Sequence, residues 1–177
     1  LFPYTTLFRS TVSPASLTFT NLNWNTPQTV TVTGADDVLD DGDVAYSIIT
    51  AAATSTDTVY NGMNAADVAV TNTDNDVAGI TITPTSGLTT TEALGTATFT
   101  VALTTQPTAD VTIALSTSDA TEGTVSPASL TFTAANWNIA QTVTVTGVDD
   151  AVDDRDVTYT IVTAAATSTD AIYNGIN

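Results

Sequence analysis

A segment of 54 residues occurs twice in this chain. Residues 11–64 recur as residues 124–177, an offset of 113, and 40 of the 54 paired positions are identical. Self-similarity of this strength indicates tandem modules of one design, and a period near 100 residues is typical of bead-like sandwich domains. We therefore expect residues 11–77 to be the C-terminal part of a first module, and residues 78–177 to be a second module that lacks its last strand.

The apolar residues within each copy alternate with period two, which is the pattern of strands buried on one face. Thr is frequent, at 41 of 177 residues, and its β-branched side chain suits a pleated surface. Turn-forming residues separate the alternating rows. The sequence predicts an all-β fold of tandem antiparallel immunoglobulin-like β-sandwiches, both truncated. The rows are Ala97/Phe99/Val101/Leu103, Val111/Ile113/Leu115, Leu130/Phe132, Val143/Val145, Val157/Tyr159/Ile161 and, closing the first copy, Val68/Val70.

The composition excludes several kinds of chemistry. The chain has no Cys, His or Lys, so the usual thiolate and imidazole nucleophiles and the common zinc ligands are missing. Its net charge of −17 disfavours nucleic acid and anionic membranes, and a cation is the natural counterpart of such a surface. No apolar stretch approaches the roughly 20 residues of a membrane span. We expect a protein that is not an enzyme, binds no nucleic acid and does not insert into membranes.

Residues 1–10, LFPYTTLFRS, differ in composition from the rest of the chain and stand outside the repeat. They resemble the in-frame translation of a short-read sequencing adapter. We expect them to be an artefact that takes no part in the fold. A genuine strand with this sequence is the alternative.

Two acidic loops occupy equivalent positions of the repeat. Each places five carboxylates within eight residues, at 36–43 and 149–156. Two unit charges about 4 Å apart repel by roughly 4 kcal/mol at an effective dielectric of about 20, so carboxylates held this close favour a bound cation. Flexible, oxygen-rich loops suit Ca²⁺ better than Mg²⁺. A solvated acidic turn is the alternative. The candidate ligands in these loops are Asp36, Asp37, Asp40, Asp41, Asp149, Asp150, Asp153 and Asp154.

The order of these features resembles that of Calx-beta-type domains. Thr91-Glu92 precedes a Thr-Ala-Thr-Phe-Thr-Val strand, Ser116-Thr-Ser-Asp119 follows the next strand, and Gln141-Thr-Val-Thr-Val leads to Asp149-Asp150. Members of that family are calcium-binding sandwiches that occur in long arrays in bacterial surface proteins. The resemblance implies ligands at Glu92, Asp119, Asp149 and Asp150, with Asp153 or Asp154, and matches Asp74 and Asp76 to the closing acidic run of the first module.

These observations predict a calcium-binding structural repeat that acts as a rigid spacer or adhesive stalk in a large secreted or cell-surface bacterial protein. Its partners would be neighbouring copies of the repeat and an extracellular glycan or protein ligand. The alternative is a carbohydrate- or protein-binding β-sandwich module. Trp24 and Trp137, each within Asn-Trp-Asn, could stack a sugar, although a large aromatic residue that closes the end of a sandwich core is the more common arrangement.

Overall fold

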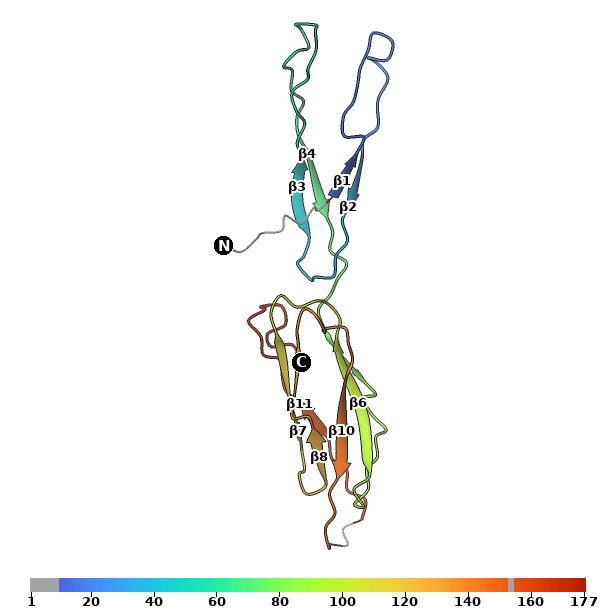
Figure 1. The fold of residues 1–177 in the computed structure, drawn as a ribbon, viewed down its shortest axis with the longest axis vertical. Coiled ribbons are helices and arrows are strands. Elements are labelled where there is room, and N and C mark those ends of the chain that lie inside the picture. Colours follow the sequence, from blue (N-terminus) through green and yellow to red (C-terminus); the bar gives the residue numbers. More distant parts are fainter. Residues whose placement is uncertain (1–9, 153–154) are drawn as a thin grey trace. The chain divides into compact units, whose positions relative to one another are not determined.

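The computed structural model describes residues 10–152 and 155–177. All regular structure in this part of the chain is β, with eleven strands in antiparallel sheets and no helix (Figure 1). The described residues fall into two compact units. The first comprises residues 10–37 and 41–75, and the second comprises residues 38–40 and 76–177.

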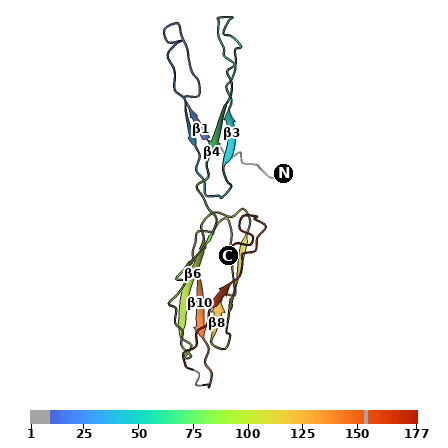
Figure 2. The same ribbon diagram turned by 180° about the vertical axis from the view of Figure 1, so that it is seen from behind.

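The second unit contains two antiparallel sheets that share one core. A four-stranded sheet has the order β5-β6-β10-β8, and Figure 2 shows β10 between β6 and β8. A three-stranded sheet has the order β11-β7-β9. The strands are β5 (Ile80–Thr83), β6 (Thr96–Leu103), β7 (Val111–Thr117), β8 (Gly123–Ser126), β9 (Ser129–Phe132), β10 (Gln141–Gly147) and β11 (Ile161–Thr163).

The core of this unit is made by the predicted alternating rows. Along β6, Phe99, Val101 and Leu103 are buried, while Thr100 and Ala102 between them are half-buried on the other face. Burying a side chain of this size contributes about 1.5–3 kcal/mol, so the inward rows dominate the stability of the sandwich-like arrangement. The core consists of Phe99, Val101, Leu103, Val111, Ile113, Leu115, Leu130, Phe132, Val143, Val145, Ala166 and Tyr173.

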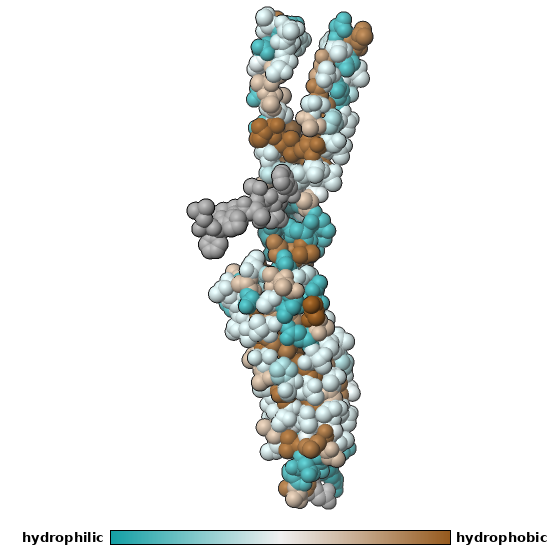
Figure 3. Space-filling model, in the orientation of Figure 1, coloured by the Kyte–Doolittle hydropathy of each residue, from teal (hydrophilic) through white to brown (hydrophobic). Residues whose placement is uncertain are grey.

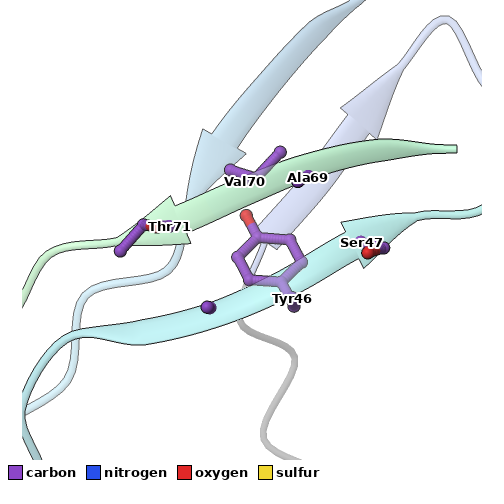
Figure 4. A pocket seen from close by; sticks show the side chains of 6 residues that line it. Tyr46, Ser47, Ala69, Val70 and Thr71 are labelled. Carbon is purple, nitrogen blue, oxygen red and sulfur yellow. The ribbon is translucent and has the colours of Figure 1, made fainter.

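The first unit contains two separate strand pairs (Figure 1). β1 (Ser10–Ser13) pairs with β2 (Thr31–Gly34), and β3 (Val44–Ile48) pairs with β4 (Val68–Asn72). β4 is the closing strand that the Val68/Val70 alternation predicts. Tyr46 and Val70 are register partners, and Figure 4 shows the Tyr46 ring lying beside Val70 across this pair.

The two copies of the repeat form the same local structure. In the first copy Val12 pairs with Val32, and in the second Val125 pairs with Val145, so all four β1–β2 pairs recur in β8–β10 at the offset of 113. The loops also agree. Gln28 Nε2 donates to the Thr18 carbonyl at 2.9 Å, and its counterpart Gln141 donates to the Thr131 carbonyl at 2.8 Å.

The same agreement extends to the loop before each Asn-Gly turn. Residues 53–63 and 166–176 repeat four backbone hydrogen bonds, among them those from Gly62 to the Ala53 carbonyl and from Gly175 to the Ala166 carbonyl, both at 2.8 Å. Gly62 and Gly175 have φ values of 86° and 91°, a left-handed conformation that glycine adopts without strain. The repeated sequence therefore determines this loop independently of its surroundings.

One predicted strand differs between the copies. Val157, Tyr159 and Ile161 are expected to lie on one strand, but only Ile161–Thr163 is a strand in the second unit. The equivalent Val44–Ile48 in the first unit is fully paired, because β4 lies beside it. The prediction of a strand at 157–160 is thus wrong: Thr160 exchanges hydrogen bonds with Ser118, but among the described residues no strand runs alongside residues 157–159.

Candidate functional site

The candidate ligands lie on five loops. Four are in the loop between β2 and β3, two follow β4, and single residues lie between β5 and β6 and between β7 and β8. Two more follow β10, and another two lie outside the described residues. In that order they are Asp36, Asp37, Asp40 and Asp41; Asp74 and Asp76; Glu92; Asp119; Asp149 and Asp150; Asp153 and Asp154.

Strand register brings three of these loops to one end of the second unit. Thr96, the first residue of β6, pairs with Thr146, and Gly123, the first residue of β8, pairs with Gly147. The segments before β6 and β8 therefore meet the segment after β10. Backbone hydrogen bonds join them, from Gly147 to the Gly95 carbonyl and from Val148 to the Glu122 carbonyl, both at 3.0 Å. Glu92, Asp119, Asp149 and Asp150 are thus carried on loops at a common end.

Asp119 has a local structural role at this end. Its Oδ1 accepts hydrogen bonds from the hydroxyl of Thr121 at 2.5 Å and from the backbone N–H of Thr121 at 3.0 Å. The Thr121 hydroxyl first, and the backbone N–H groups second, stabilise the carboxylate and hold the pKa of Asp119 below its ordinary value. The side chain is therefore charged at neutral pH and already oriented by its own turn.

Asp150 forms a similar local contact. Its Oδ1 accepts a hydrogen bond from the Val152 backbone N–H at 2.7 Å. Asp149, Asp150 and Glu92 are exposed. An Asx-type turn of this kind is formed by Asp whether or not an ion is present, so it orients the loop without by itself identifying a ligand.

In the first unit, Asp74 links the segment that follows β4 to the acidic loop between β2 and β3. Its Oδ2 accepts hydrogen bonds from the backbone N–H groups of Asp41 at 3.0 Å and Gly42 at 2.7 Å. In return, the Asp74 N–H donates to Oδ1 of Asp43 at 2.9 Å. The structure thus brings Asp74 to the acidic loop, and it adds Asp43, which counts among the five carboxylates of the sequence run but is absent from the predicted ligands.

The middle of the same loop belongs to the second unit. The Asp40 Oδ2 accepts a hydrogen bond from the Ala78 N–H at 2.9 Å, and the Val38 carbonyl accepts one from the Gln106 N–H at 2.8 Å. Asp40 is half-buried there. Residues 38–40 therefore have hydrogen-bond partners in the second unit and residues 41–43 in the first, which the sequence alone could not indicate, because all of them stand in one continuous acidic run.

The donor chemistry of these loops fits a hard divalent cation, since every candidate ligand atom is an oxygen. The positions of the acidic side chains, however, do not converge on one point. Among residues 10–152 and 155–177, no group of three or more acidic side chains is gathered closely enough to hold a metal ion. The side chains that approach the acidic loop of the first unit are instead held by backbone N–H groups.

Two buried polar side chains of the second unit are absent from the predicted sites. Asp170 accepts hydrogen bonds from the Thr108 N–H at 2.7 Å and the Ile172 N–H at 2.9 Å. Tyr173, which directly precedes Asn174-Gly175, bonds to Thr105 in the core. The Ser-x-Asp pattern at 168–170 is the signal for Asp170, because Ser and Asp at this spacing form local turns.

Comparisons with protein-family models, curated proteins and solved structures find no match for this chain. The described part of the chain contains no helix with the length and hydrophobicity needed to cross a membrane.

Proposed function

We propose that this chain is a calcium-binding structural repeat that serves as a rigid spacer or adhesive stalk in a large secreted or cell-surface bacterial protein. The observation that carries the proposal is the agreement between the two copies. Strand register, the long loop that contains Gln28 and the loop before the Asn-Gly turn all recur at an offset of 113 residues. A spacer requires uniform modules, whereas a recognition site requires only one specialised copy.

The immunoglobulin-like description of the module is part of this proposal. The described part of the second unit has seven strands in two antiparallel sheets around one core, which is the strand number and layering of constant-type immunoglobulin domains. Modules of this kind, joined in series, provide length without a large hydrophobic core. The many outward-facing Thr residues and the net charge of −17 suit an exposed extracellular location.

The calcium proposal rests on the charge and position of the acidic loops. Five carboxylates within eight residues repel one another, and a divalent cation relieves that repulsion. In the first unit Asp74 reaches the acidic loop through two backbone hydrogen bonds, so a linker carboxylate and loop carboxylates lie in one neighbourhood. An ion bound there would have to draw the carboxylates of Asp41, Asp43 and Asp74 together, since they do not form a close group among the described residues, and it would supply charge neutralisation and order to the loop.

The carbohydrate-binding alternative receives less support. Trp137 packs against the core of the second unit, and its carbonyl accepts a hydrogen bond from the Leu103 N–H at 2.9 Å. The Trp137 ring is thus partly engaged by protein, whereas its counterpart Trp24 is 68% exposed in the first unit. We therefore favour the structural role over the sugar-stacking role.

Thermal unfolding tests the proposal. A ligand that binds only the folded state stabilises it by about 2.7 kcal/mol at 100 times its dissociation constant, so millimolar Ca²⁺ should raise the melting temperature by several degrees relative to EDTA. Mg²⁺ should do much less. An Asp41→Asn, Asp74→Asn variant should lose part of the response, whereas Asp110→Asn, an exposed residue outside these loops, should keep it. Equal melting temperatures with Ca²⁺ and EDTA would contradict calcium binding.

A further inference from the structure

Each copy of the repeat contains one Asn-Gly pair, and the chain has no others: they are Asn61-Gly62 and Asn174-Gly175. An Asn followed by Gly is prone to deamidation, because glycine has no side chain to hinder its own backbone nitrogen. In this reaction the Gly nitrogen loses its proton and attacks the side-chain carbonyl carbon of Asn, and the amide nitrogen leaves as ammonia. Water then opens the resulting succinimide to Asp or isoaspartate, so each event adds one negative charge.

Burial does not protect either pair. Asn61, Gly62, Asn174 and Gly175 are all exposed. In the first unit the pair belongs to the long loop between β3 and β4 (Figure 1), and the surface of that loop is largely hydrophilic or neutral in Figure 3. Water and hydroxide therefore have access to these residues, and resistance to deamidation has to come from the conformation of the loop.

Hydrogen bonds occupy both reacting groups in the first copy. The Gly62 N–H donates to the Ala53 carbonyl at 2.8 Å, so the nitrogen that would attack is held by a carbonyl from the opposite side of the loop. The Asn61 Oδ1 accepts a hydrogen bond from the Ser55 N–H at 3.1 Å, which fixes the side chain that would be attacked. Succinimide formation requires a deprotonated Gly nitrogen, and the bond to Ala53 keeps its proton in place.

The second copy restrains its Asn-Gly pair in the same way. The Gly175 N–H donates to the Ala166 carbonyl at 2.8 Å, and the Asn174 Oδ1 accepts a hydrogen bond from the Ser168 N–H at 3.3 Å. The two bonds are thus present in both copies, although the units around them differ. The sequence of the loop itself therefore provides the restraint.

An Asp carboxylate closes the loop in each copy. The Asp57 Oδ1 accepts a hydrogen bond from the Val59 N–H at 2.9 Å, and the Asp57 carbonyl accepts one from the Asn61 N–H at 3.0 Å. Asp170 accepts hydrogen bonds from the equivalent groups of the second copy. An Asx turn of this kind directs the path of the chain, so Asp57 positions Asn61 without touching the atoms that react.

We propose that each Asn-Gly pair is a conditional deamidation site, which is withheld from reaction while its loop is closed and reacts when the loop opens. The observed rate is then the rate of an unstructured Asn-Gly pair multiplied by the fraction of time that the loop is open. Deamidation thus reports local opening of the repeat and adds negative charge to a chain whose net charge is already −17. The inference is independent of the calcium proposal, because it involves none of the candidate ligands.

Incubation of the full-length chain at mildly alkaline pH tests the proposal. Digestion in acid and mass spectrometry give the extent of deamidation at Asn61 and Asn174, and synthetic peptides of residues 53–63 and 166–176 are the unstructured references. We expect both positions to react at least about tenfold more slowly in the folded chain than in the peptides, because loop opening breaks several hydrogen bonds. In urea that unfolds the chain, the rates should rise to those of the peptides in the same urea.

Variants at Asp57 test whether the closed loop is the cause. Asp57→Ala removes the Asx turn and should accelerate deamidation of Asn61 by about threefold or more, the effect of losing one hydrogen bond. Asn174 in the same molecule is the internal control and should keep its rate. Asp57→Asn retains the accepting oxygen and should preserve the slow reaction. Equal rates in the folded chain and the peptides would overturn the proposal, and so would an Asp57→Ala variant in which Asn61 reacts no faster than in the parent chain.

Discussion

The hydroxyl of Tyr173 donates a hydrogen bond at 2.8 Å to the carbonyl oxygen of Thr105, 68 residues away in the sequence. The backbone N–H of Thr105 donates to the same phenolic oxygen at 3.0 Å, and the Thr105 hydroxyl lies 2.7 Å from it. Both side chains are buried. The loop after β6 is therefore held to the loop before the Asn-Gly turn through one phenol group.

Removal of that hydroxyl should destabilise the second unit. In Tyr173→Phe the buried N–H and hydroxyl of Thr105 lose their partner, and an unsatisfied buried polar group costs about 1–3 kcal/mol. The matched control is Tyr60→Phe, at the equivalent and exposed position of the first unit, which should change stability by less than about 0.5 kcal/mol. Chemical denaturation of both variants gives the comparison. Equal effects would show that the Thr105 contact adds no stability.

A methyl group at Gly147 should be poorly tolerated. A Cβ placed there would lie 2.2 Å from the backbone carbonyl oxygen of Thr91, so the backbone would have to move. At the equivalent Gly34 the obstacle is the side-chain oxygen of Asn72, which can rotate away. We expect Gly147→Ala to cost about 1–3 kcal/mol, the usual range for overpacking, and Gly34→Ala to cost less. Denaturant titration of the two variants would contradict this packing if the order were reversed.

The stability of the second unit should fall in acid through Asp170. Burial alone would raise the pKa of this carboxyl, but hydrogen bonds from the backbone N–H groups of Thr108 and Ile172 outweigh it and hold the pKa below its ordinary value of 3.8. A depressed folded-state pKa gives stability that is present above the unfolded-state pKa and lost as the pH falls through the folded-state pKa. Asp170→Asn should therefore flatten the pH dependence of unfolding below about pH 3.8. Parallel acid profiles for the variant and the parent chain would contradict this role.

A copy of residues 65–76 appended after Asn177 should complete the second unit. The appended residues continue the repeat, and they include the counterpart of β4, which pairs with Val44–Ile48 in the first unit. We expect residues 157–161 to become a strand, with slower hydrogen exchange there and a higher melting temperature, because each ladder hydrogen bond and cross-strand pair adds stability. An appended segment with Val68 and Val70 changed to Asp is the control. Identical behaviour of the two extended chains would show that the closing strand is not formed.

Much of the fold follows from local sequence. The period-two rows predict β6, β7, β9 and β10 with their buried faces. Apolar residues at every second position all lie on the same face when the segment is a strand. Of the row Val157, Tyr159 and Ile161, only Ile161 lies in a strand, because alternation predicts which face is buried but not whether a neighbouring strand is present. Similarly, Leu17 and Phe19 match Leu130 and Phe132 in type, yet form no strand in the first unit.

The candidate site is less predictable than the fold. Sequence places the acidic residues in loops, and register explains why the loops of Glu92, Asp119 and Asp149 share one end of the second unit. Tertiary hydrogen bonds divide one acidic run between two sets of partners. Asp40 accepts a hydrogen bond from the Ala78 N–H, and the Asp41 N–H donates one to Asp74. No local pattern encodes such contacts between positions more than 30 residues apart.

Direct titration of the full-length chain with Ca²⁺ tests the central claim. Isothermal titration calorimetry should show saturable binding with a dissociation constant of about 10⁻⁴ to 10⁻³ M, the range of extracellular modules. The Asp41→Asn, Asp74→Asn variant should bind fewer ions, and Asp110→Asn should match the parent chain. Saturable binding that is reduced only in the double variant is the predicted result. A chain that binds no Ca²⁺ at millimolar concentration, or a double variant that binds as the parent does, would contradict the calcium-binding role proposed for these loops.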